Sequence, residues 1–155
     1  MNNEMNDFSI PGVPNAFGFV PSPTNYIRPG KRPLSCITPI IVTYPNGTLY
    51  ISIGAAGGSR IITATVQCVM NVLDHGMTLP EALQSPRMHD QLLPALTHFE
   101  WTFDNSTVEG MKERGHNATW VGPHESSVQG TRRLGNGTFE AAGEPRQKNS
   151  GGLAV

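Results

Sequence analysis

The chain has 155 residues, 37% of them hydrophobic, and it carries 11 Lys and Arg against 12 Asp and Glu. This length suits one domain with one core. The formal net charge of −1 argues against a nucleic-acid partner, because no basic stripe stands out. No run of about 18 apolar residues occurs, so the sequence predicts no membrane-spanning helix.

The first quarter of the chain is rich in proline. Six prolines fall within residues 9–34, and they exclude a long helix or a central strand there. Apolar side chains such as Ile10, Phe17 and Tyr26 distinguish this stretch from a disordered linker. We therefore expect residues 9–34 to form an extended wrapping segment on a surface that another segment or another chain provides.

A strand-turn-strand pattern follows. Residues 39–44 and 48–53 are β-branched and aromatic, and Pro45-Asn46-Gly47 between them predicts a hairpin. The first strand is nearly all apolar, which favours coverage on both faces. The second strand alternates, with Leu49, Ile51 and Ile53 on its apolar side.

A glycine-rich turn over residues 54–58 then leads into a predicted helix. Apolar residues at helical spacing predict one buried face of that helix; they are Ile62, Val66, Val69 and Leu73. Ser59 is the expected cap at its start and Gly76 at its end.

The rest of the chain alternates short helices and strands. Thr78-Leu79-Pro80-Glu81 predicts a capping box and a helix to about Gln84. The later expected elements are a strand over 95–101, a helix opened by Ser106-x-x-Glu109, a strand over 118–122, and a hairpin joining 127–134 to 138–144 through Gly135-Asn136-Gly137. This order favours an α+β layered fold.

Three short stretches carry candidate chemistry. In "GAAGGSR" (54–60), a helix start with free N–H groups could hold an anion or an oxyanion, although the stretch lacks the Lys of a phosphate loop and also suits a plain tight turn. Glu4 and Asp7 could clamp an ammonium group or form a solvated acidic face. Ser35 and Cys36 could donate to a carboxylate.

Together these stretches resemble the small, catalytic subunit of the γ-glutamyltranspeptidases, the glutathione hydrolases. The matching segments are "NNEMNDFS", "PGVPN", "GKRPLSC", "GAAGGSRIIT", "PRMHDQLLP" and "TFEAAGEPRQKNSGG". They cover nearly the whole chain, and the last one looks most like fungal members. The resemblance implies an N-terminal-nucleophile hydrolase with a four-layer αββα fold, of which residues 1–155 would be most of the small-subunit domain.

The resemblance also implies roles for the candidate residues. Glu4 and Asp7 would hold the substrate α-amino group, Ser35 and Cys36 its α-carboxylate, and the backbone of Gly57 and Gly58 the oxyanion. The family's small subunit begins with a nucleophilic Thr, whose own α-amino group is the base. That Thr attacks the γ-glutamyl amide of glutathione and passes the acyl group to water, an amino acid or a peptide. No cofactor or metal is implied, and the partner is the large subunit of the same precursor.

This sequence departs from the family pattern in three ways, one of which is Asn6 at a position where Asp is frequent. The Thr-Thr-His or Thr-Ser-His start is absent, and Thr97-His98 lies in a predicted strand, so we expect a fragment without its nucleophile segment that is inactive alone. Cys36 replaces a common Ser, which weakens one hydrogen bond by about 1 kcal/mol. The alternatives are a non-catalytic glycoprotein module that kept the fold, and a related acylase of the same superfamily.

Four glycosylation sequons suggest passage through a secretory route, to the cell exterior, a membrane anchor on the large subunit, or a vacuole. Their asparagines are Asn46, Asn105, Asn117 and Asn136. The polar start of the sequence has no signal-peptide pattern, which fits a piece of a longer protein. Cys36 and Cys68 could pair, but two cysteines make no disulfide framework.

Overall fold

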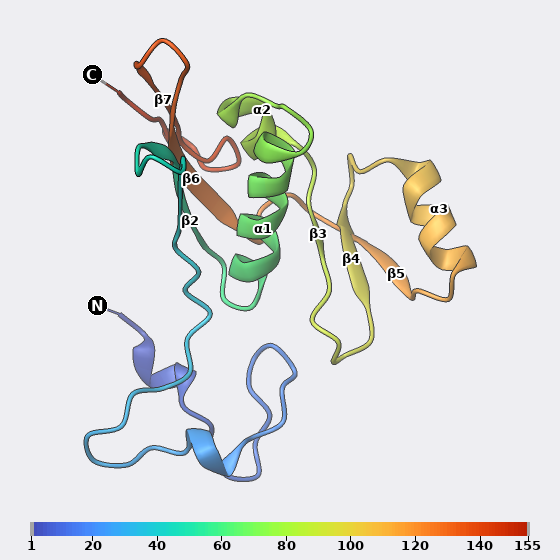
Figure 1. Cartoon of the computed structure of the whole chain (residues 1–155). Coiled ribbons are helices and arrows are strands. Elements are labelled where there is room, and N and C mark those ends of the chain that lie inside the picture. Colours follow the sequence, from blue (N-terminus) through green and yellow to red (C-terminus); the bar gives the residue numbers. More distant parts are fainter. Residues whose placement is uncertain (1, 155) are drawn as a thin grey trace.

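The computed structural model describes residues 2–154, which form two sheets, three helices and a long N-terminal segment. The larger sheet has the order β1 (Ile40–Thr43), β2 (Leu49–Ala56), β6 (Ser127–Arg133), β7 (Phe139–Ala142), and every neighbouring pair is antiparallel. Helices α1 (Arg60–Leu73) and α2 (Leu79–Gln84) pack on one face of this sheet, as Figure 1 shows. The predicted α+β class and both predicted hairpins are confirmed.

The core lies between this sheet and the two helices. Ile51 and Ile53 of β2 are buried, as their alternation predicts, and they pack with Cys68 and Leu83. The capping box of α2 is also confirmed: Thr78 Oγ1 accepts from the N–H of Glu81, and a Glu81 carboxylate oxygen accepts from the N–H of Thr78 at 2.8 Å. Both cysteines are free thiols.

Strand β1 differs from the prediction. Its burial alternates along the strand, and Ile41 is 70% exposed, so two-sided coverage is wrong for the described residues. The reason is topological: β1 is an edge strand, and α1 and α2 pack over β2, β6 and β7.

Helix α1 buries a different face from the predicted one. Its buried residues are Ile61, Ala64, Thr65, Cys68 and Val72. Ile62, Val66 and Leu73 of the predicted face are each more than 40% exposed, as is Met70. Small residues face the sheet because they allow the helix to approach it closely. The predicted C-terminal cap is wrong by two residues: Asp74 caps α1, and Gly76, with a φ of +66°, lies in the turn that follows.

The smaller sheet pairs β3 (Met88–His89), β4 (Thr97–Glu100) and β5 (Ala118–Val121), with β4 and β5 parallel and joined through α3 (Asn105–Glu113). The predicted cap of α3 is wrong by two residues. Asp104 caps the helix and accepts from the N–H of Thr107 at 2.7 Å. Hydrogen bonds from the Ser106 and Thr107 side chains, followed by that N–H, lower the pKa of Asp104 to about 2.

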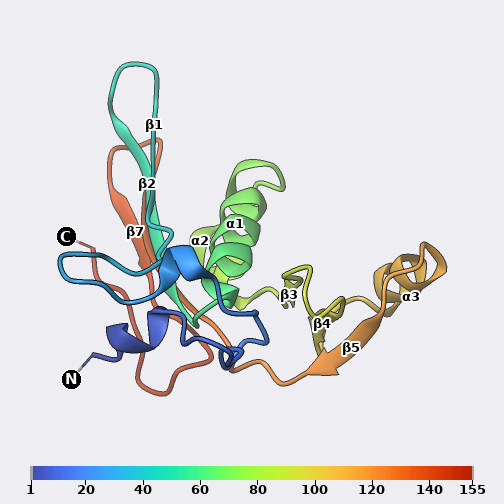
Figure 2. The same ribbon diagram turned by 90° about the horizontal axis from the view of Figure 1, so that it is seen from below.

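The N-terminal segment, residues 2–38, contains two short 3-10 helices, η1 (Glu4–Asp7) and η2 (Pro23–Asn25). It lies beyond the end of the larger sheet, on the side where α1 begins (Figures 1 and 2). Many of its apolar side chains are exposed, among them Val20 at 73% and Ile37 at 74%. Among the described residues, no helix is long and apolar enough to cross a bilayer.

Candidate active site

The glycine-rich turn connects the centre of the larger sheet to the start of α1. Gly54 to Ala56 are the last residues of β2, so the turn is shorter than predicted and centres on Gly57 and Gly58. Their φ angles are +138° and +61°, a region in which side chains are disfavoured. Within residues 2–154, neither glycine N–H donates a hydrogen bond. Two free donors therefore lie at the positive end of a 14-residue helix.

Gly57 packs directly against the segment that leads into β6. A Cβ atom on Gly57 would lie 2.7 Å from the carbonyl oxygen of Glu125 and 3.0 Å from the Cα of Ser126. Arg60, the first residue of α1, forms an ion pair with Glu125 and contacts His98 Nδ1 at 2.9 Å. Burial, followed by the charge of Arg60, lowers the pKa of His98, so its ring accepts from Arg60 near neutral pH.

Ser59 does not cap α1 as predicted. Its side chain accepts no hydrogen bond from the first turn of the helix. The residue is 7% exposed, and its hydroxyl has no partner in the described part of the chain. Ser59 thus occupies the N-cap position before Arg60, but its buried side chain makes no hydrogen bond to the helix N–H groups.

The two predicted substrate clamps are tied together by Asn25. Its buried amide nitrogen donates to the carbonyl oxygen of Asp7 at 2.7 Å, and its amide oxygen accepts from the N–H of Leu34 at 2.9 Å. Asp7 belongs to the first predicted clamp, and Leu34 immediately precedes the second, Ser35-Cys36. One side chain therefore fixes two segments that are 27 positions apart in the sequence.

The electrostatics agree with this proximity. Burial of Cys36, followed by the negative charge of Asp7, raises the pKa of the Cys36 thiol, so the thiol keeps its proton and remains a donor. The hydroxyl oxygen of the exposed Ser35 accepts from the N–H of Ile37 at 3.1 Å, which leaves its own proton free to donate. Glu4 and Asp7 are exposed at the two ends of η1.

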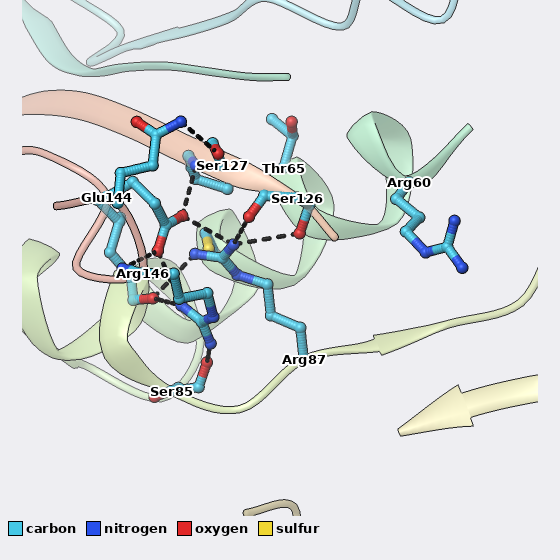
Figure 3. Close-up of polar contacts among 12 residues, drawn as sticks. Arg60, Thr65, Ser85, Arg87, Ser126, Ser127, Glu144 and Arg146 are labelled. Atoms are coloured by element: carbon cyan, nitrogen blue, oxygen red, sulfur yellow. Dashed lines mark hydrogen bonds and ion pairs between the residues drawn. The ribbon is translucent and has the colours of Figure 1, made fainter. Parts of the chain in front are cut away.

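The structure also contains a buried ionic cluster that the sequence did not predict; Arg87, Glu144 and Arg146 of this cluster are labelled in Figure 3. The Glu144 carboxylate lies 2.9 Å from Arg87 Nη1 and 3.0 Å from Arg146 Nη1, and Glu144 is fully buried. Glu100 completes the cluster, with its carboxylate 2.6 Å from Arg146 Nη2. Its members come from β4, from the loop before β3 and from the C-terminal tail, so no short motif reveals it.

This cluster supports the glycine turn from behind. Arg87 Nη1 donates to the carbonyl oxygen of Ser126 at 3.1 Å, and Glu144 accepts from the N–H of Val128 at 2.7 Å. Ser126 immediately precedes β6, Val128 is its second residue, and Ser126 is one of the two residues against which Gly57 packs. The ion pairs therefore anchor the wall behind the predicted oxyanion donors. No group of three potential metal ligands occurs among residues 2–154.

Comparison with known proteins gives one consistent result. The family model described as gamma-glutamyltranspeptidase matches residues 1–154. The chain is 56% identical to the glutathione hydrolase proenzyme of Arthroderma benhamiae and 46% identical to the glutathione hydrolase of Aspergillus flavus. Each alignment covers all of this chain and 26% of the relative, so the chain spans about a quarter of the length of these fungal proteins.

A solved structure has the same fold. The crystal structure of the Helicobacter pylori gamma-glutamyltranspeptidase T380A mutant superposes with a TM-score of 0.85 at 36% sequence identity. The match covers 95% of this chain and 81% of that chain.

Proposed function

This chain belongs to the γ-glutamyltranspeptidase family, and from that premise we propose that it supplies the substrate clamps and the oxyanion donors of a γ-glutamyltransferase/glutathione hydrolase. The substrate class is γ-glutamyl amides such as glutathione, and the acyl acceptors are water, amino acids or peptides. The Thr nucleophile and a large subunit would come from the remainder of a longer precursor.

The observation that carries this proposal is the pair of unpaired N–H groups at Gly57 and Gly58. A tetrahedral intermediate needs donors that are already aimed at its oxyanion, because they then require no reorganisation during the reaction. The turn presents its donors at a helix start and holds Gly57 against Glu125 and Ser126. Each such donor is worth roughly 3–4 kcal/mol of transition-state stabilisation in typical enzymes.

The clamps support the same substrate. A γ-glutamyl group carries an ammonium and a carboxylate at the end away from the scissile amide. Asp7 offers an exposed carboxylate for the ammonium, while Ser35 and Cys36 offer donors for the carboxylate. Asn25 ties together the two segments that carry these groups, as recognition of a free α-amino acid requires.

Exposed apolar surface supports a partner. The outer face of α1 presents Ile62, Val66 and Met70 to solvent, and the N-terminal segment presents Ile10, Val20 and Ile37. Surfaces of this kind mark interaction sites. The fungal relatives are about four times as long as the matched region, which leaves ample chain to cover both surfaces.

The first experiment compares this chain alone with the chain assembled with its nucleophile segment and large subunit. We expect release of p-nitroaniline from γ-glutamyl-p-nitroanilide by the assembled protein and none by the chain alone. Turnover by the purified chain would show that the nucleophile does not lie in the remainder. An inactive but folded assembly would favour the non-catalytic glycoprotein module.

Substitution of Asp7 tests the ammonium clamp. Asp7→Asn removes the negative charge at the same size, so KM for γ-glutamyl-p-nitroanilide should rise roughly 10- to 100-fold, the equivalent of one charged hydrogen bond. The matched control is Asp74→Asn, at the exposed C-terminal cap of α1, which should leave KM unchanged. An equal KM in both variants would remove Asp7 from the site.

We also propose that the protein follows a secretory route. All four sequon asparagines are exposed, which an attached glycan requires. Treatment of the protein from its native host with an N-glycosidase should reduce its mass. No mass change on treatment, together with unmodified sequon peptides, would contradict this route.

A further inference from the structure

A compact loop in the N-terminal segment, residues 15–19, places the aromatic ring of Phe17 against the glycine turn. Asn15 organises the loop: its side-chain oxygen accepts from the N–H groups of Phe17 and Phe19, each at 3.0 Å. Its backbone N–H donates to the carbonyl of Phe19 at 3.0 Å, and Gly18 adopts a φ of +85°. We call residues 15–19 the Phe17 loop.

The ring of Phe17 lies directly over Gly58. A Cβ atom on Gly58 would lie 2.1 Å from Cζ and 2.6 Å from Cε1 of Phe17, so the ring fills the space that any side chain there would occupy. Glu125 and Ser126 bound Gly57 in the same way. The turn is therefore held between two segments that are distant in the sequence.

Two adjacent glycines need such external restraint. Their backbone has more accessible conformations than that of other residues, and no side chain of their own anchors them. The segment behind Gly57 is fixed by the buried ion pairs of Arg87 and Glu144. The Phe17 loop has no comparable core, because Phe17 itself is 38% exposed, so its position depends on polar contacts.

Gln91 supplies the main polar contact. Its amide nitrogen donates to the carbonyl oxygen of Phe17 at 2.6 Å and to that of Leu93 at 2.9 Å. Because two carbonyl oxygens require donors, the amide oxygen of Gln91 must face His89 Nε2, 3.0 Å away. His89 Nε2 then carries a proton, and its Nδ1 lies 2.8 Å from Thr63 Oγ1, which is also 3.2 Å from the carbonyl oxygen of Arg60.

These hydrogen bonds link the first turn of α1, through β3, to the loop that covers Gly58. We propose that Gln91 is a positioning residue for the oxyanion turn: it holds the Phe17 ring on Gly58 and so keeps the Gly57 and Gly58 N–H groups aimed at one point. The inference rests on the proposed function, since it assigns a purpose to those donors. Gln91 itself touches neither the substrate nor the reacting atoms.

The test uses Gln91→Glu in the assembled enzyme. This change keeps the size of the side chain and the acceptor for His89, but it places a carboxylate oxygen against two carbonyl oxygens. With γ-glutamyl-p-nitroanilide, kcat should fall roughly 10- to 100-fold, the range for a misplacement of about 1 Å, while KM stays within about twofold. Phe17→Ala should give the same split between kcat and KM, and Phe17→Tyr should retain most of the activity.

Hydrogen exchange provides a readout that does not depend on turnover. Amides in a peptide covering residues 54–60 should exchange faster in Gln91→Glu and in Phe17→Ala than in the unmodified protein. The matched control is Gln84→Ala, at an exposed position at the end of α2, which should alter neither kcat nor exchange.

The outcomes separate the two proposals. If the unmodified assembly turns over substrate but Gln91→Glu leaves kcat and the exchange of 54–60 unchanged, the positioning role is wrong. If the unmodified assembly has no γ-glutamyl activity, the proposed function is wrong, and the exchange data alone decide whether Gln91 holds the turn. A rise in KM at constant kcat would place Gln91 in substrate binding instead and overturn the inference.

Discussion

The larger sheet with α1 and α2 and the N-terminal segment each carry part of the candidate site, but they are stabilised in different ways. The sheet layer has a continuous apolar core and a buried cluster of ion pairs. In the N-terminal segment, Asn25 is the one buried residue among positions 2–38. The glycine turn, which is the proposed oxyanion site, is therefore fixed mainly by packing, against residues 125–126 and against the ring of Phe17. The chain holds its substrate clamps mainly through one amide side chain.

The largest expected effect comes from breaking the ionic cluster of the sheet layer. Glu144→Gln in the assembled enzyme leaves Arg87 and Arg146 buried without their shared carboxylate. Removal of one partner from a buried pair costs about 3–5 kcal/mol, so the free energy of unfolding in urea should fall by that amount. Tryptophan fluorescence would follow the transition.

The control for this prediction is Glu109→Gln, which breaks the exposed pair with Lys112 and should cost less than about 1 kcal/mol. The effect of Glu144 should also depend on pH. Burial opposes its ionisation, but hydrogen bonds from the N–H groups of Val128 and Arg146 and the charge of Arg87 outweigh burial and lower its pKa. Its contribution is therefore complete above the ordinary value of 4.5 and is lost as the pH falls below it. Equal stability losses at pH 7 and pH 3 would contradict this account.

Gly57→Ala should have the next largest effect. The added Cβ would clash with Glu125 and Ser126, and the φ of +138° disfavours any side chain there. The turn must therefore move, and its N–H groups no longer point at the oxyanion. We expect kcat with γ-glutamyl-p-nitroanilide to fall by about 10²–10³, the cost of one lost oxyanion donor. Gly54→Ala is the matched control, because its Cβ meets nothing within 4 Å; equal losses in both variants would contradict a specific role for Gly57.

Asn25→Asp should separate the two regions. It keeps the acceptor for Leu34 but loses the donors to Asp7 and Ser9, at a cost of about 1–3 kcal/mol to the local structure. We expect KM to rise about tenfold and amides of residues 2–9 and 31–38 to exchange faster, while those of the Phe17 loop, held by Asn15 and Gln91, and those of 54–60 stay unchanged. Faster exchange across α1 would mean that the two regions are one cooperative unit.

The smallest expected effect is that of Cys36→Ser. A hydroxyl is a stronger donor than a thiol, so binding of the substrate carboxylate should improve by about 1 kcal/mol, which lowers KM roughly fivefold. Ser106→Ala, at an exposed position of α3 in the smaller-sheet layer, serves as a control for general effects of a small substitution. A higher KM in Cys36→Ser would show that the proposed carboxylate clamp requires the larger sulfur atom at position 36.

Local patterns predicted much of the fold correctly. The hairpins and the capping box of α2 depend on a few adjacent residues, so they are readable from sequence. The buried face of α1 was not, because apolar residues occur on two of its faces. Helical periodicity cannot tell whether Ile62 and Val66 or Ala64 and Cys68 meet the sheet of this chain.

The candidate site was likewise predictable only where local sequence patterns carry it. The resemblance named Gly57, Gly58, Asp7 and Cys36, and the structure shows how each is held, while their catalytic roles stay predictions. Gln91 lies within a segment that matches the family, but the sequence alone assigns it no role, because its partner Phe17 is 74 positions away in the chain. The ionic cluster joins Arg87, Glu100, Glu144 and Arg146, which are too far apart in the sequence for a local pattern to indicate it.

The enclosure of the glycine turn has a consequence for recombination between related genes. Phe17, Gly58 and Gln91 fit one another, as do Gly57 and residues 125–126, although the chain visits them at widely separated points. A crossover that takes residue 17 from one parent and residue 91 from another would join an aromatic ring to an anchor that did not evolve with it. In chimeric libraries, Phe17, Gly57, Gly58, Gln91 and residues 125–126 should therefore all come from the same parent.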